Sequence, residues 1–235
     1  MLAGAGESSR PKVRVLVRVT IDPDMKKKCP AVALGCLSAE IVAAPASESL
    51  QSQLRSCAAR ILALPEPKSA LESPGILATR SAYKALGKDP ARYRGSAEAL
   101  LRRIIAGKEL PRISNVVDIV NLLSVESRLS IGLYDLALVQ GDVVFRTGRA
   151  GETYKGIGKY DLNLERLPVF SDAAGPHGSP TSDSERTMVT VATSRILAII
   201  ISFGGTPHLQ NWIDRLSALL LEHAAARNIE ARIVA

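Results

Sequence analysis

The residues best suited to chemistry lie together in one polar segment, PHGSPTSDSERTMVT, at residues 176–190. It carries six hydroxyl side chains with one His, one Asp, one Glu and one Arg. The strongly apolar stretch VATSRILAIIISF follows directly. A polar segment that leads into a buried strand can direct its side chains into a pocket. The alternative is a surface loop in which Ser and Asp side chains hydrogen-bond the backbone.

Two side chains of this segment have the chemistry of a general base. His177 and Asp183 can each orient a water molecule, and we take them as candidate catalytic residues. If the segment forms a pocket, the hydroxyl and guanidinium groups around these two residues could hold a ribose or an amino acid. We therefore assign substrate binding to Ser179, Thr181, Ser182, Arg186 and Thr187.

A second short segment, TGRAGE at residues 147–152, belongs to the same candidate pocket. It contributes Glu152, and Arg146 directly precedes it, so both are assigned to substrate binding. Because the two segments flank predicted strands of one sheet, we expect their ends to converge and to line a concavity. The alternative for Arg146 and Glu152 is a structural ion pair across a glycine-rich turn.

Positive charge is concentrated in residues 80–112. This window holds nine basic and three acidic residues, a net charge of +6 out of +7 for the chain. Such a patch suits a phosphate backbone, and the interleaved Tyr83 and Tyr93 could assist it. We assign RNA binding to four of its side chains, Arg92, Arg94, Arg102 and Arg103. The alternative is an ordinary solvated helix surface.

Several other classes of function have no support in the sequence. In GRAGETYKGIGK, Ile157 and Gly158 replace the Lys and Ser/Thr that a P-loop requires, and Asp161 stands where a dinucleotide fingerprint needs its third glycine. No GxSxG motif is present. The three Cys and three His residues are dispersed. We therefore expect no metal and no cofactor.

The chain also carries no evident membrane signal. MLAGAGESSRPK has no apolar core, so it does not resemble a signal peptide. The apolar run at residues 196–201 is far too short to span a bilayer. We expect a cytoplasmic protein without a membrane partner.

The hydrophobic pattern predicts an α+β fold, a largely antiparallel sheet flanked by helices. Residues 1–11 are expected to be flexible, and residues 12–235 to form a single domain. Predicted helices cover residues 50–64, 96–107 and 115–124, and Ser96 is the predicted N-cap of the second. In the last predicted helix, Thr206 is the cap and Pro207 the first residue. Residues 65–75 are predicted to be a linker. Predicted strands cover residues 12–21, 31–44, 131–139, 142–147, 166–170, 187–191, 195–202 and 229–235.

Residues 112–152 resemble a signature of a known family. The stretches NVVDIVN, YDLALVQGDVVFR and GE occur there in the order found in the β subunit of phenylalanyl-tRNA synthetase, in its third/fourth domain, the tRNA-binding and editing module. The matching positions are Asn115, Asp118, Asn121, Asp135, Gly141, Arg146, Gly151 and Glu152. The stretch ALGKDPARYRGSAEALLRRI is similar to the lead-in of free-standing relatives of this module.

The resemblance implies the α+β fold of that module and, as partner, a tRNA or aminoacyl-tRNA. The family module hydrolyses tyrosine that is wrongly attached to the phenylalanine tRNA. Two of its positions differ here: Gly132 stands where the family has a His, and Ile199 where it has a Glu that recognises the tyrosine hydroxyl. The resemblance therefore does not imply tyrosine specificity.

Three hypotheses follow from these patterns. The first is a tRNA-binding protein that hydrolyses mischarged aminoacyl-tRNA in trans. The second is a non-catalytic RNA-binding module, and the third is a small-molecule protein that binds amino acids. The basic window favours the first two hypotheses, whereas the two family positions that differ favour the last two.

Overall fold

The computed structural model describes residues 17–158 and 160–235. The predicted flexible N-terminus, residues 1–11, and the first part of the strand predicted at 12–21 lie outside the described residues. Of that strand the structure describes β1, Val19–Ile21. Lys159 of the glycine-rich turn is also outside the description.

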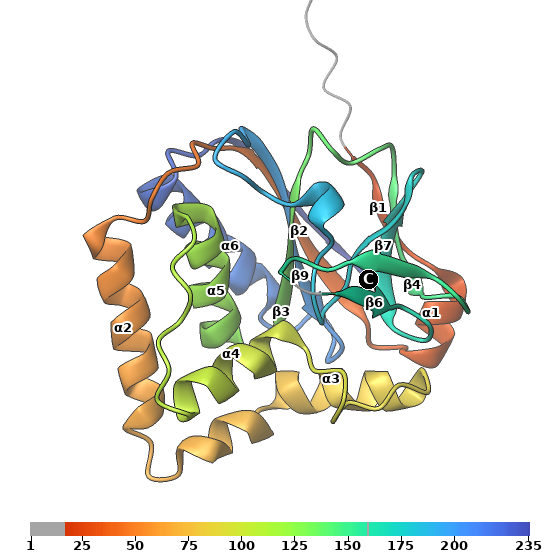
Figure 1. Ribbon diagram of the computed structural model, residues 1–235, viewed down its shortest axis with the longest axis horizontal. Helices are drawn as coiled ribbons and strands as arrows, with labels where there is room; N and C mark the ends of the chain where they lie inside the picture. The colour runs from red at the N-terminus through yellow and green to blue at the C-terminus, as the bar shows by residue number, and fades with distance from the viewer. Residues whose placement is uncertain (1–16, 159) are drawn as a thin grey trace, which may run out of the picture.

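An antiparallel sheet of four strands forms the middle layer of the molecule (Figure 1). Its order is β10 (Arg227–Val234), β2 (Ala33–Glu40), β9 (Arg195–Ser202) and β3 (Ser130–Asp135). Strand β9 is buried from its second residue to its last, because it lies between β2 and β3 and has apolar neighbours on both faces.

Helices cover one face of this sheet (Figure 1). They are α2 (Glu48–Leu62), α4 (Ser96–Ile105), α5 (Asn115–Ser127) and α6 (Leu209–His223). Ile196, Ala198 and Ile200 of β9 face the core they form. A Cβ on Gly35 would lie 3.1 Å from Ile213 Cγ1 of α6, so this glycine allows a close helix–sheet contact, and β2 continues through it unbroken.

A second sheet covers the opposite face. Its order is β1, β4 (Val143–Thr147), β7 (Pro168–Asp172) and β8 (Gly175–Gly178), with β1 parallel to β4 and the other pairs antiparallel. Leu197, Ile199 and Ile201 of β9 belong to the core on this side. Helix α1 (Pro23–Lys28) packs against β4, and β5 (Thr153–Lys155) and β6 (Asp161–Asn163) form a separate hairpin.

The prediction of an α+β fold with antiparallel strands and flanking helices is confirmed, although the strands within residues 17–158 and 160–235 divide among three sheets. The predicted linker at 65–75 is wrong, since it holds the 3-10 helix η1 (Pro67–Glu72) and the start of α3 (Pro74–Ala85). The strand predicted at 187–191 is also wrong, because a 3-10 turn, η2 (Glu185–Thr187), leads into irregular backbone there.

Two helix starts differ from the prediction. Gly95 is the N-cap of α4, one residue before Ser96, and α6 begins at Leu209 after His208, whose φ is 62°. Among the described residues, none of the helices has the length and apolar character needed to cross a bilayer.

Candidate functional site

The polar segment between β8 and β9 is held by three buried tyrosines from three other elements. Tyr134 of β3 donates a hydrogen bond to Asp183 Oδ1 at 3.0 Å. Tyr154 of β5 donates to the backbone carbonyl of Ser182 at 2.6 Å. Tyr83 of α3 shares a hydrogen bond of 2.8 Å with Thr181 Oγ1. The segment therefore lies against the body of the protein.

Burial raises the pKa of all three tyrosines above the ordinary phenol value. Each hydroxyl therefore stays protonated in the neutral range. The Tyr134 and Tyr154 hydroxyls can therefore donate to the segment at neutral pH.

Asp183 links the polar segment to strand β3 and to the turn that follows β5. Its Oδ2 atom accepts a hydrogen bond from the backbone amide of Leu133 in β3, at 3.1 Å. Its carbonyl accepts from the amide of Ile157, at 3.0 Å, and Ser184 forms a bridge with Gly156. These contacts bring the segment to the end of the β5–β6 hairpin.

His177, the other candidate base, lies in β8 with no exposed surface. Its ring stands edge-on to Tyr134, with 4.6 Å between the ring centroids, and its Nδ1 atom is 3.5 Å from Thr187 Oγ1. Its Nε2 atom has no hydrogen-bond partner among the described residues. Burial lowers the pKa of His177 to about 4, against the opposite influence of Asp172, so the imidazole is neutral at pH 7.

Both arginines of the candidate pocket form paired hydrogen bonds with a carboxylate. Arg186 donates to the two Asp172 oxygens at 2.8 and 3.1 Å. Arg146 donates to the two Glu152 oxygens at 2.7 and 2.8 Å, and the same hydrogen bonds lower the pKa of Glu152. This fork geometry is the strongest form of an Arg–carboxylate contact, and it fixes both guanidinium groups.

The hydroxyls of the segment mostly bond within the segment itself. Ser179 Oγ accepts from the amides of Thr181 and Ser182 and donates to the Ser182 carbonyl, which makes a serine turn. Ser182 Oγ donates to the carbonyl of Asp183 at 3.4 Å.

The four candidate RNA-binding arginines lie on a second surface, which we call the basic face: residues 88–94 and the outer side of α4. Arg92, Arg94 and Arg103 are exposed. Arg102 is also exposed, although its Nε atom donates to the buried Glu98 at 2.8 Å. Tyr83 is buried and does not belong to this face.

The basic face meets the polar segment where α4 begins. The amide of Ser96 donates to the carbonyl of Pro180 at 2.6 Å. Residues 88–94 are anchored beside it, because Lys88 Nζ donates to the carbonyls of Asn163 and Glu165 and lies 3.9 Å from the centroid of the Tyr93 ring. The basic face and the polar segment are therefore neighbours, and they meet through this backbone hydrogen bond.

The two positions that differ from the family signature face each other in the central sheet. Gly132 of β3 is paired with Ile199 of β9, and Ile199 is fully buried. A Cβ on Gly132, or on Gly178 of β8, would lie 2.1 Å from the Tyr134 hydroxyl oxygen. The phenol of Tyr134 thus occupies the space between these glycines.

Sequence reasoning missed the residues that hold this region in place. Tyr134, Tyr154 and Asp172 are not among the candidates, because their roles depend on contacts between distant elements. Gly132 and Gly178 could have indicated this arrangement from the sequence, because a glycine within a strand often marks a place where another part of the protein approaches the backbone closely. Among the described residues, no group of three or more His, Cys, Asp or Glu side chains is arranged to hold a metal ion.

The comparisons identify the family. The family model of the B3/4 domain matches residues 78–207, more than half of the chain. The chain therefore belongs to the B3/4 domain family, as the sequence resemblance predicted.

Among solved structures, the chain is similar to an N-terminal fragment of the phenylalanyl-tRNA synthetase beta-subunit from Pyrococcus horikoshii. The identity is 13% and the TM-score 0.43, and the match covers 93% of this chain and 50% of that one. This chain thus spans about half the length of that fragment. The search of curated proteins gave no match.

Proposed function

We propose that the protein binds tRNA through the basic face. The observation that carries this proposal is membership of the B3/4 domain family, whose match at residues 78–207 includes Arg92, Arg94, Arg102 and Arg103. The Pyrococcus horikoshii fragment named above is part of a tRNA synthetase, which is in keeping with an RNA partner.

Charge on the basic face supports an anionic partner. Glu98 is buried between Arg80 and Arg102, so it offsets part of their charge, whereas Arg92 and Arg94 have no ion-pair partner among the described residues. Arg103 donates through Nε to the carbonyl of Glu109, and this contact leaves its positive charge uncompensated. Exposed guanidinium groups on anchored backbone are well suited to phosphate contacts.

The test is tRNA binding as a function of salt concentration. In a variant with Arg92, Arg94, Arg102 and Arg103 replaced by Gln, we expect affinity to fall at least tenfold. The slope of log K against log salt concentration should decrease by about one for each phosphate that the variant no longer binds.

A matched control removes four charges elsewhere, at Lys27, Lys28, Arg195 and Arg227, which are all exposed. This control has the same net charge as the test variant. It should keep the affinity and most of the salt slope. Equal losses of tRNA affinity in the two variants would mean that binding depends only on the net charge of the protein. That result would refute the basic face as a specific RNA-binding surface.

Hydrolysis of mischarged aminoacyl-tRNA is the second function we propose, with His177 as the general base and Asp183 as its partner in orienting water. One observation favours it: His177 Nε2 is unpartnered among the described residues and belongs to a neutral imidazole. Nε2 would take a proton from water as the water oxygen attacks the ester carbonyl. The imidazolium would return this proton to the ribose oxygen as the ester C–O bond breaks, so the ribose leaves as a hydroxyl. Since His177 is fully buried, residues 179–187 must move for substrate to reach it.

In this second proposal, the substrate pocket forms beneath that segment. Ser179, Thr181, Ser182 and Thr187 would line it, with Arg146, Glu152 and Arg186 at its edge. Deacylation across a panel of correctly and wrongly charged tRNAs tests the proposal. We expect His177→Ala to lower hydrolysis at least 100-fold while tRNA binding is unchanged. Absence of hydrolysis by the wild-type protein would leave tRNA binding as the function.

A further inference from the structure

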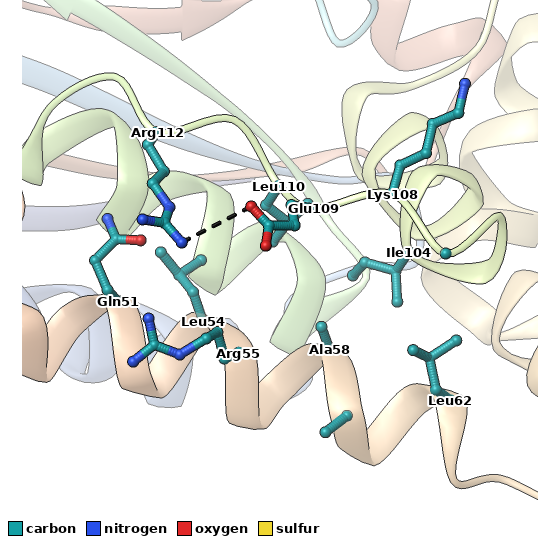
Figure 2. A pocket seen from close by; sticks show the side chains of 12 residues that line it. Gln51, Leu54, Arg55, Ala58, Leu62, Ile104, Lys108, Glu109, Leu110 and Arg112 are labelled. Atoms are coloured by element: carbon teal, nitrogen blue, oxygen red, sulfur yellow. Dashed lines mark ion pairs between the residues drawn. The ribbon is translucent and has the colours of Figure 1, made fainter.

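A cavity lies between α2 and residues 107–112, the loop after α4 (Figure 2). Its volume is about 230 Å³. Leu54, Ala58 and Leu62 line it from α2, where they follow one another at helical spacing, and Ile104 and Leu110 line it from the other side. The cavity is therefore an apolar groove that runs along α2.

Cationic groups border this groove. Arg55 lines it from α2, where its guanidinium is paired with Glu48, and Lys108 and Arg112 line it from the loop. Glu109 is the one acidic residue of the lining, and its carboxylate lies 3.8 Å from the Arg112 guanidinium. Lys108 has no ion-pair partner among the described residues, so the lining has a net positive charge.

The dimensions limit what the groove can hold. Residues 51–62 of α2 extend over about 16 Å at 1.5 Å per residue. A volume of about 230 Å³ lies below the roughly 300–1,000 Å³ of pockets that hold drug-sized ligands. The groove therefore suits a small, flexible apolar ligand.

We propose that this groove binds a linear aliphatic carboxylate of medium chain length. The hydrocarbon chain lies on Leu54, Ala58 and Leu62, and the carboxylate pairs with the cations of the 107–112 loop. Exposed Leu62, which is 47% accessible, becomes covered on binding. This site adjoins the basic face, because Arg103 donates to the carbonyl of the lining residue Glu109, but neither Arg102 nor Arg103 lines the groove.

Calorimetric titration with decanoate, below the concentration at which it forms micelles, tests the proposal. We expect saturable binding of one decanoate per chain and at least tenfold weaker binding of decan-1-ol, which has the same chain without the charge. Lack of saturable decanoate binding, or equal affinity for the alcohol, would overturn the proposal.

Two variants locate the site. Ala58→Phe fills the groove and should weaken decanoate binding at least tenfold, whereas Ala218→Phe on the exposed side of α6 should leave it unchanged. The double variant Lys108→Gln/Arg112→Gln should weaken decanoate binding but not decan-1-ol binding, and it provides the test if Ala58→Phe does not fold. Decanoate binding that survives in both groove variants would refute this location.

Discussion

Tyr134 occupies the central position in the candidate site. Its hydroxyl bonds Asp183, its ring contacts His177 edge-on, and Gly132 and Gly178 lie close to that hydroxyl. A buried phenol needs a hydrogen-bond partner, and Asp183 provides one. The acidic residue that the sequence suggests as a base therefore also has a structural role, since it joins β3 to the polar segment.

The close contact at Gly178 gives a first prediction. Gly178→Ala would place a Cβ 2.1 Å from the Tyr134 hydroxyl oxygen and 2.6 Å from its ring carbons. Because Tyr134 is fully buried, we expect a loss of about 2–3 kcal/mol in the free energy of unfolding, measured with urea. Gly204→Ala is the matched control, since its nearest neighbour would be 3.9 Å away and little should change.

The buried imidazole of His177 gives a second prediction. Its folded-state pKa, about 4, lies below the value of about 6.5 expected in the unfolded chain. Between these two values the unfolded state binds more protons, so stability falls as pH decreases, by at most about 1.4 kcal/mol per pH unit. Asp172 and Arg186 are the charged groups that influence His177.

The measurement for His177 compares wild type with His177→Leu in urea unfolding from pH 7 to pH 4. The variant cannot take up this proton, so its stability should decline less steeply over that range. Parallel curves for the two proteins would show that His177 is readily protonated in the folded state.

At the scale of elements, Asn115 joins three segments at the start of α5. Its side-chain amide donates to the carbonyls of Val42 and His223, both at 2.9 Å, and its Oδ1 accepts from the amide of Ala44. The family signature contains this Asn, and the structure gives it a physical role: it connects α5 to the ends of β2 and α6.

This connection gives a third prediction. Asn115→Ala leaves four backbone groups without this partner, the carbonyls of Val42 and His223 and the amides of Ala44 and Val116, in a site where the side chain is almost fully buried. We expect a loss of about 2–4 kcal/mol of stability in urea unfolding. Asn121→Ala makes the same chemical change on a partly exposed turn of α5 and should cost under about 1 kcal/mol. Similar losses in both variants would argue for a helix-propensity effect instead.

Elements with a strong hydrophobic period were predictable from the sequence, and those with a weak period were not. The run at residues 195–202 and the helix from 115 were found close to their observed bounds. Helix α3 was missed because a proline can indicate either a turn or the first residue of a helix. Here Pro67 begins η1 and Pro74 begins α3. The contacts of Tyr83 and Tyr154 with the polar segment could not be predicted, since they join residues 98 and 28 positions apart.

At the scale of the whole molecule, the central sheet has a core on each face. Successive residues of β9 alternate between them: Ile199 faces the second sheet and Ile200 faces the helices. Because both cores use the same strand, we predict that the two layers fold and unfold together as a single domain. A substitution that weakens packing on either face of the central sheet should therefore destabilise both layers.

The last prediction tests this coupling. Ile199→Ala and Ile200→Ala each remove a fully buried side chain and should each cost about 2–5 kcal/mol. Trp212, the chain's single tryptophan, packs against the helix-side core, so its fluorescence reports on that layer. Ile199 lies on the other face, yet we expect its truncation to lower the urea midpoint of the Trp212 signal about as much as truncation of Ile200 does. A Trp212 midpoint that moves only with Ile200→Ala would show two independently folding layers and refute the single domain.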